Sequence, residues 1–407
     1  MKCCCINCFQ DAAIREFIKS LAAFGDCDYC GEQRVPTGDV ATVGDFVRRG
    51  LDRAYGDASN TDDPNYEYLR ASSPACVLEE EAGIIVTARD KGLAGDLLST
   101  FGEGSSEQDY QWLSSGYDSI ARLCNFFEAY GIEDANPYTS AWEHFKSRVM
   151  HNTRFFDIDE SRQSLIGEIS GLFPQLVGVL RTGTPVYRAH LAEDCLPDDP
   201  WALQQRLGPP PLHCAQNNRM SPRGISYLYV SGDPETCVAE IQPNVGREVW
   251  VARFAALTDI KLLDLTKLPK TSIFSADYDD NRDWAEHFLS EFVVEVSQPP
   301  RSKDDPLEYI PTQVLAEHIR AQGYQGIAYQ SAQHPEGVNY TLFCSPEAAP
   351  GLHYRPDRPV FHEWLRINEV STVRVTGLRL DMATIVTRTI LKQPSDPDNL
   401  PLLSRFG

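Results

Sequence analysis

Apolar residues in the first half of the chain recur every three or four positions. This spacing is typical of amphipathic helices, in which one face packs on a core. It predicts helices over 44–55, 110–130, 139–151 and 161–180. Polar loops are expected at 56–64 and 102–108, and a short strand at Gly83–Ala88. We therefore expect this half to be mainly α-helical.

The pattern changes after Gly183, where short apolar runs are separated by Gly and Pro. Such runs are typical of short strands. They predict strands at 186–189, 226–230, 248–254, 260–264, 327–329 and 340–343, with helices at 236–241, 283–296 and 313–321. A Pro-rich link at 298–311 interrupts the pattern, and a last alternating run covers 372–380. The second half is expected to be an α+β domain built on short strands.

The chain has 407 residues, which is more than the roughly 250–300 over which a single core usually grows. We expect a small cysteine-rich subdomain over 1–40, a helical domain over 41–182, an α+β domain over 183–349 and a C-terminal extension over 350–407. No apolar run approaches the roughly 18 residues that suggest a membrane span. No membrane association is expected.

Composition narrows the class of partner. The chain is 42% hydrophobic and 23% charged, as in globular proteins, and its formal net charge is −21. Such a charge repels nucleic acid and anionic lipid, so neither is an expected partner, although a local arginine cluster can still bind a small anion. The first residues resemble neither a secretory signal nor a transit peptide, and we expect a cytoplasmic location. The sequence leaves open whether the chain forms a homo-oligomer.

Cysteines are concentrated near the N-terminus, where Cys5 and Cys8 form one CxxC pair and Cys27 and Cys30 a second. Four thiolates at this spacing suit a closed tetrahedral Zn²⁺ site, which is structural because no coordination position stays open. The competing interpretations are a disulfide pair or ordinary buried thiols. Cys3 or Cys4 is an alternative to Cys5, although only Cys5 has the CxxC spacing to Cys8.

Four segments of the second half occur in one order over Gly183–Ser345. They are Val186-Tyr187-Arg188-Ala189, then Asn218-Arg219-Met220 with Tyr229 and Glu240, then Gly323 to Ser331, and finally Gly337-Val338-Asn339. Together they resemble the RES family, named for its Arg, Glu and Ser. Here Asn218 replaces the family's usual Gly, and Met220 and Ser221 replace an aromatic residue and Asn. The N-terminal half is similar to the zinc-bearing HEPN-like region fused to some RES domains, including Asn7 and Phe9 around the first CxxC.

The resemblance implies a fold related to ADP-ribosyltransferases and an activity that breaks down NAD⁺, often as the toxin of a toxin–antitoxin pair. An antitoxin or other inhibitory protein is therefore an expected partner, and NAD⁺ the expected substrate.

The residue types suit this chemistry. Cleavage at the nicotinamide builds positive charge on the ribose, so a carboxylate is needed beside C1′, and Glu240 is the candidate. Arg188 and Arg219 could pair with the pyrophosphate. Tyr229 is expected to stack on nicotinamide, Ser331 and Asn339 to hydrogen-bond the ribose or amide, and Tyr187 to help bind the substrate.

Three alternatives compete with a NAD⁺ glycohydrolase. The first is an ADP-ribosyltransferase that modifies a protein. The second is a non-catalytic zinc and helical binding module with a degenerate RES scaffold. The third is a ribonuclease, which needs an Arg-x4–6-His pair on one helix face. That spacing occurs at Arg282/His287, Arg206/His213 and Arg355/His362, all outside the expected helical half.

Overall fold

The computed structural model describes residues 2–57, 72–101, 120–124, 140–154, 160–193, 195–269, 271–297, 307–344, 361–377 and 382–389. The chain divides into two compact units. The first unit comprises Met1–Phe145, Ile158–Ser170 and Pro269–Phe288, and the second comprises Lys146–Asp157, Gly171–Leu268 and Leu289–Gly407. Mixed helix and sheet is thus the fold class, with a helical N-terminal half and a sheet-rich C-terminal half.

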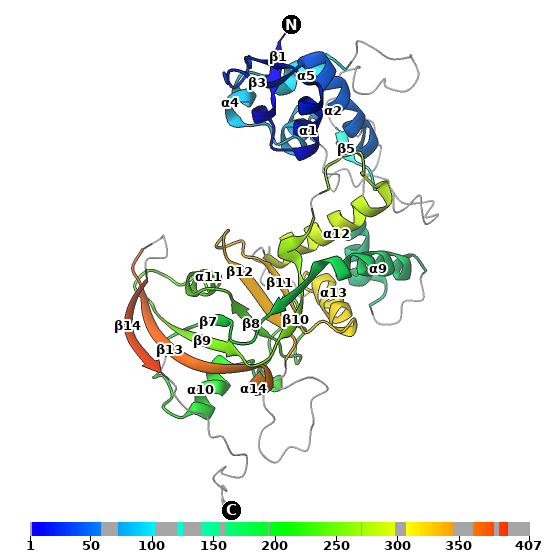
Figure 1. Ribbon diagram of the computed structural model, residues 1–407. Helices are drawn as coiled ribbons and strands as arrows, with labels where there is room; N and C mark the ends of the chain where they lie inside the picture. The colour runs from blue at the N-terminus through cyan, green and yellow to red at the C-terminus, as the bar shows by residue number, and fades with distance from the viewer. Residues whose placement is uncertain are drawn as a thin grey trace, which may run out of the picture. The chain divides into compact units, whose positions relative to one another are not determined.

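The first unit is a set of short helices around a small sheet (Figure 1). Three strands form this sheet in the order β1-β3-β2, all antiparallel. Its strands are β1 (Cys3–Cys5), β2 (Phe24–Gly25) and β3 (Val35–Asp39), and its helices are α1 (Ala12–Ser20), α2 (Val40–Ala54), α3 (Pro74–Glu81), α4 (Val86–Asp90) and α5 (Leu93–Ser99). A second pair, β4 (Tyr55–Asp57) and β5 (Ile120–Arg122), is antiparallel.

Helix α2 shows how the sequence sets this packing. Asp39 caps its N-terminus by accepting a hydrogen bond from the Thr42 N–H at 3.0 Å, which satisfies one of the free donors of the first turn. Val43, Val47 and Leu51 follow at helical spacing and are fully buried. They join the core that also holds α1 and α5. The helix predicted at 44–55 is confirmed.

Two predictions for the first half were wrong at the residues that the structure describes. Instead of a strand at Gly83–Ala88, helix α4 begins at Val86. Within 110–130 the described residues include β5, because β4 offers an antiparallel partner and tertiary contacts override local propensity. Arg122 of β5 also pairs with Glu81 and Asp283, each at 2.7 Å. The other residues of 110–130 lie outside the described part, apart from Leu123 and Cys124.

The helix predicted over 161–180 stops early. Helix α9 (Glu160–Leu172) gives way to a 3₁₀ turn that contains Pro174, and β6 (Val177–Leu180) follows. Proline lacks the N–H that an α-helix would need there, and β6 instead pairs antiparallel with β10. Near the predicted helix over 139–151 the structure has α8 (Ala141–Ser147), extended by a π turn over Arg148–Asn152.

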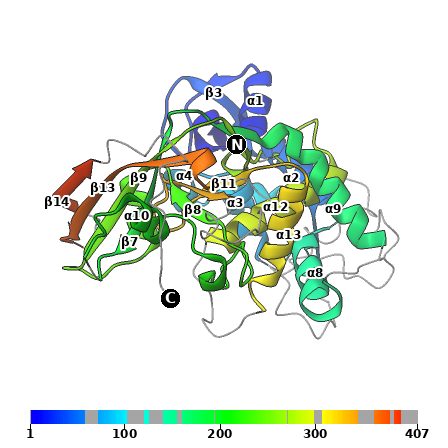
Figure 2. The ribbon, with the colours of Figure 1, turned by 90° about the horizontal axis from the view of Figure 1, so that it is seen from below.

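The second unit is built on a nine-stranded sheet with the order β14-β13-β9-β7-β8-β12-β11-β10-β6 (Figures 1 and 2). Its remaining strands are β7 (Pro185–Leu191), β8 (Leu228–Ser231), β9 (Glu248–Ala256), β10 (Ile260–Asp264), β11 (Gly326–Gln330), β12 (Val338–Leu342), β13 (Leu365–Val375) and β14 (Met382–Thr389). Strand β13 pairs with β9, so the segment expected to be a separate C-terminal extension contributes two strands to the sheet.

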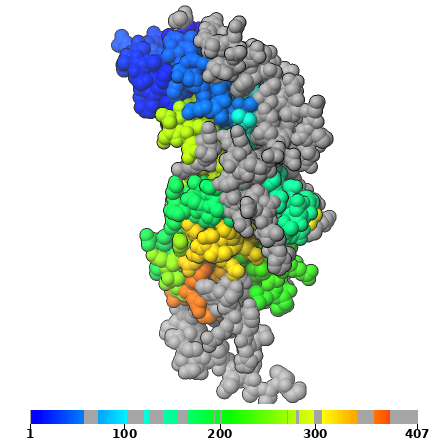
Figure 3. All heavy atoms as spheres, turned by 90° about the vertical axis from the view of Figure 1, so that its right-hand side faces the viewer, coloured from blue at the N-terminus to red at the C-terminus, as the bar shows by residue number. Residues whose placement is uncertain are grey.

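The helices of the second unit are α10 (Pro200–Leu207), α11 (Pro234–Glu240), α13 (Ile310–Ala321) and α14 (Phe361–Trp364). Leu207 of α10 and Phe361 of α14 pack with Val186 on one face of the sheet. On the other face Val238 of α11 packs with Ala189. In Figure 3 the yellow atoms of α13 lie on the visible surface of this unit. Both faces of the central strands are therefore covered.

The division between the two units falls within helix α12 (Asp280–Ser297). Its residues up to Phe288 belong to the first unit, and those from Leu289 belong to the second. None of the helices among the described residues has the length and apolar character needed to cross a membrane.

Candidate active site

Glu240 is the last residue of the short helix α11. Asp233 caps the helix by accepting from the Thr236 N–H at 2.7 Å, and Pro234 occupies the first turn, where its missing N–H costs nothing. The apolar side of the helix, which includes Cys237 and Val238, is buried. This packing fixes the helix and leaves the Glu240 side chain at an exposed end.

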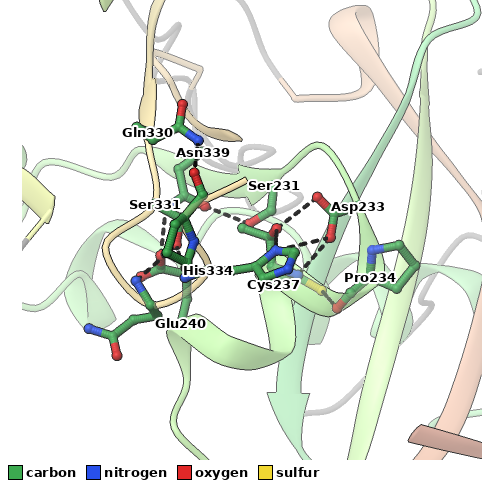
Figure 4. Close-up of polar contacts among 12 residues, drawn as sticks. Ser231, Asp233, Pro234, Cys237, Glu240, Gln330, Ser331, His334 and Asn339 are labelled. Atoms are coloured by element: carbon green, nitrogen blue, oxygen red, sulfur yellow. Dashed lines mark hydrogen bonds and ion pairs between the residues drawn. The ribbon is translucent and has the colours of Figure 1, made fainter. Parts of the chain in front are cut away.

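Two predicted site residues, Ser331 and Asn339, contact Glu240 (Figure 4). The Ser331 hydroxyl donates to Glu240 Oε1 at 2.6 Å, and the Asn339 amide donates to the same oxygen at 2.6 Å. Ser331 and Asn339 are both buried. The described residues offer no hydrogen bond to Oε2, so one carboxylate oxygen is held and the other has no partner among them.

The hydrogen at Ser331 has one possible direction. Its oxygen already accepts from the backbone N–H groups of Gln333 and His334, at 3.2 and 3.0 Å. A hydroxyl has a single proton and two acceptor sites, so the proton points to Glu240. Glu240 Oε1 therefore accepts this hydrogen bond.

The loop from Ser331 to Gly337 lies tightly against α11. A Cβ on Gly337 would fall 1.9 Å from Thr236 Oγ1, so this approach requires glycine. Thr236 Oγ1 donates to Asp233 at 2.7 Å, and His334 Nδ1 lies 2.8 Å from the same Thr236 oxygen. Because that hydroxyl proton is committed to Asp233, His334 Nδ1 must be the donor. These contacts hold Ser331 in register with Glu240.

Two tyrosines lie beside this cluster. Burial raises the pKa of Tyr329 to about 12, and the negative charge of Glu240 adds to the shift. The positive charge of Arg219 acts on Tyr329 in the opposite sense, so both residues are near its hydroxyl. The Tyr229 hydroxyl is 3.0 Å from Ser221 Oγ, and burial raises the Tyr229 pKa above its usual range. Both phenols are therefore neutral at pH 7.

Arg219 lies in a loop that is fixed on α13. Gln313 donates to Asn217 Oδ1 at 2.8 Å and to the Asn218 carbonyl at 2.7 Å. The Arg219 guanidinium donates to the Glu295 carbonyl and lies 5.6 Å from the Tyr309 ring centroid. Partial burial lowers its pKa. No described carboxylate forms an ion pair with it, so this cation keeps capacity for an anionic ligand.

Arg188 is placed differently from the other predicted residues. Alternation along β7 puts it on the face of Val186, opposite to Tyr187. It donates to the carbonyls of Leu207 and Gly208. Burial lowers the Arg188 pKa to about 10, which still leaves the guanidinium charged at neutral pH, and Tyr229 is near enough to affect this pKa. The structure does not bring Arg188 into hydrogen-bond contact with Glu240.

Tyr187 marks where β7 meets β8. It is the one register position that joins the two strands, and it lies opposite Ser231. Ser231 in turn donates to Asn339 Oδ1 at 2.7 Å. Glu240, Ser331 and Asn339, which we call the Glu240 cluster, therefore lie beside the point where β7 pairs with β8.

The four predicted metal ligands of the first unit converge. The Sγ atoms of Cys5, Cys8, Cys27 and Cys30 all lie within 4.8 Å of one another, and the closest pairs are 3.3, 3.4 and 3.8 Å apart. Tetrahedral Zn²⁺ with Zn–S bonds of about 2.3 Å separates its sulfurs by about 3.8 Å, so the cluster fits such an ion.

The turn geometry around these cysteines also fits a metal site. The Cys30 N–H donates to Cys27 Sγ at 3.5 Å, and Gly31 follows with φ of +82°, a conformation that favours glycine. Cys4 lies outside the cluster, with its Sγ 3.8 Å from the Gly38 carbonyl, and every described cysteine is a free thiol. The structure thus favours Cys5 over Cys3 and Cys4.

Two family models match the chain, one in each half. The RES domain model matches residues 185–363, and the model of HEPN/RES N-terminal domain 1 matches residues 22–163. Residues 185–363 are thus a RES domain, and it follows a HEPN/RES N-terminal domain. A chain of the crystal structure of the M. tuberculosis MbcT-MbcA toxin-antitoxin complex is 14% identical, with 54% of this chain and 94% of that chain covered, at a TM-score of 0.26. No curated protein matches the sequence.

The sequence patterns did not point to three residues beside the Glu240 cluster: Ser231, Tyr329 and His334. Tyr329 and His334 lie in or beside the motif that ends in Ser331, so their position gave some signal. Ser231 gave none, because its contact with Asn339 spans more than one hundred residues. The replaced residues of the Arg219 loop also have defined places, since Met220 is buried and Ser221 contacts Tyr229.

Of the three Arg-x4–6-His pairs, Arg282/His287 falls on α12, in the segment Pro269–Phe288 that belongs to the first unit. As expected, the pair lies outside residues 41–182.

Proposed function

We propose that the RES domain cleaves NAD⁺ at the bond between nicotinamide and ribose. The observation that carries this proposal is the exposed Glu240 residue, whose carboxylate Oε1 is held by Ser331 and Asn339 while Oε2 has no partner among the described residues. A carboxylate fixed by two buried donors is preorganised and needs no rearrangement as charge develops on a substrate.

The chemistry follows from this geometry. The C1′–N bond breaks with its electron pair leaving on nicotinamide, which departs as a neutral molecule. The ribose becomes cationic in the transition state, and Glu240 stabilises that charge. Water then adds to C1′ and releases a proton, giving ADP-ribose. A protein nucleophile in place of water would make the enzyme an ADP-ribosyltransferase.

The cationic and aromatic residues supply the binding groups. Arg219 has no carboxylate partner among the described residues and suits the pyrophosphate, which needs partners for the charges it takes out of water. Arg188, a second cation near Tyr229, is proposed for the same group. Tyr229 and Tyr187 offer rings for the nicotinamide and ribose.

The cysteine cluster is proposed to hold a structural Zn²⁺ in the first unit. Four thiolates leave no coordination position for substrate, so the ion has no role in the reaction. Because an active enzyme of this kind depletes NAD⁺ in its own cell, we also propose that it is the toxin of a toxin–antitoxin or phage-defence system, restrained by an inhibitory partner.

The test is nicotinamide release from saturating NAD⁺, followed by chromatography, with the full-length protein. Glu240→Gln is compared with Glu235→Gln, a matched control that removes an exposed carboxylate from the first turn of the same helix. Loss of release only in Glu240→Gln supports the proposal, with calorimetry to show that NAD⁺ still binds. Equal turnover in wild type and Glu240→Gln, or an inactive wild type, overturns it.

A further inference from the structure

The orientation of the Asn339 amide decides whether its NH₂ group or its oxygen faces the Glu240 carboxylate. An amide has one accepting end and one donating end, and the two are similar in shape. Glu240 Oε1 accepts from Ser331, so it can tolerate only the donating end of Asn339 at 2.6 Å. With the amide reversed, two acceptor oxygens would face each other at this short distance.

Ser231 is the group that selects the correct orientation. Strands β8 and β12 pair with Ser231 opposite Asn339, which brings the two side chains together on one face of the sheet. With the NH₂ group turned to Glu240, Asn339 Oδ1 points to Ser231 and accepts its hydroxyl proton at 2.7 Å. Both residues are buried, so bulk water does not replace the hydrogen bond between Ser231 and Asn339.

We propose that Ser231 is a positioning residue for the reaction: its hydroxyl locks the Asn339 amide so that the NH₂ end faces Glu240. The inference rests on the proposed function, since its effect on turnover needs Glu240 to act in the reaction. Ser231 reaches the carboxylate through Asn339, and it therefore acts on the placement of Glu240.

Kinetics of four proteins tests this link: wild type, Ser231→Ala, Asn339→Ala and the double variant. Ser231→Ala should lower kcat for nicotinamide release about tenfold, the size expected when one buried hydrogen bond is lost, with KM for NAD⁺ changed less than about twofold. In the Asn339→Ala background the same change should alter kcat by less than about twofold, because its target is gone.

Two further variants separate positioning from general packing. Ser231→Thr keeps the hydroxyl on a strand that accepts β-branched residues, and it should recover most of kcat. Ser226→Ala removes another buried serine hydroxyl from the second unit, outside the Glu240 cluster, and should leave kcat unchanged. An equal loss of kcat from Ser231→Ala in both backgrounds, or no recovery with Thr, overturns the proposal.

The melting temperatures of the four proteins make the result independent of activity. If Ser231 and Asn339 are coupled, the double variant should lose less than the sum of the two single losses. A wild type that releases no nicotinamide overturns the proposed function. Changes in melting temperature that simply add in the double variant overturn the proposed coupling between Ser231 and Asn339. The two failures can therefore be told apart.

Discussion

The cysteine cluster of the first unit and the Glu240 cluster of the second are both sets of converging polar side chains, but they are built differently. All four cysteines come from the first 30 residues and point at one another, which leaves no group free. Glu240, Ser331 and Asn339 come from three separate segments, and their contacts leave one carboxylate oxygen open. The first arrangement suits a structural ion, and the second suits a reacting substrate.

The difference predicts that removing the metal should affect folding and that removing the carboxylate should affect turnover. Cys27→Ser, or treatment with a chelator, should unfold the part of the first unit around β1 and α1. Structural Zn²⁺ supplies on the order of 10 kcal/mol to small sites, so the effect should be the largest of this series. Elemental analysis should find about one Zn²⁺ per chain, and metal-free protein that stays folded would contradict the assignment.

Glu240→Gln should produce the opposite result. The substitution keeps the shape and one acceptor oxygen but deletes the negative charge, and its cost should appear in the transition state. Loss of one preorganised electrostatic partner typically lowers kcat by on the order of 10²–10³, or about 3–4 kcal/mol. The melting temperature should change little, because the Glu240 side chain lies at an exposed end of α11. A large loss of stability with unchanged kcat would make Glu240 a structural residue.

The arginines should affect binding more than the chemical step. Arg219→Ala should weaken NAD⁺ binding by about 2–3 kcal/mol if the guanidinium pairs with a phosphate, and Arg188→Ala should do the same. Lysine should recover only part of the loss, since it lacks the planar fork of donors. Calorimetry of both variants decides this, and unchanged affinity in each would move the phosphate site elsewhere.

Cys4→Ala should have the smallest effect. Cys4 is fully buried, as are Cys5 and Cys8, but its thiol faces the Gly38 carbonyl and lies outside the cluster. Its removal should cost about 1 kcal/mol of stability, as for a small buried group, and leave the Zn²⁺ content at the wild-type level. A loss of metal would mean that Cys4 takes the place of Cys5 as a ligand.

The sequence by itself determined the elements whose signals are local. The two CxxC pairs predicted the four cysteines that converge, and the alternating runs predicted strands close to β7, β9 and β10. The order of the family motifs also identified Glu240, Ser331 and Asn339, which the fold brings within hydrogen-bond distance. These features follow from short spacings along the chain or from a pattern of residues in a fixed order.

Only the tertiary structure decided the remaining features. Residues 177–180 form a strand because β10 offers a partner, and β5 forms where Arg122 meets Glu81 and Asp283. The role of Ser231 depends on β8 lying beside β12, and the separation of Arg188 from Glu240 depends on the face to which β7 turns it. For β6, β5 and Ser231 the deciding hydrogen bond or ion pair joins residues far apart in sequence, so no local pattern carries the information. For Arg188 the sequence gives the alternation along β7, and only the fold shows what lies on each face.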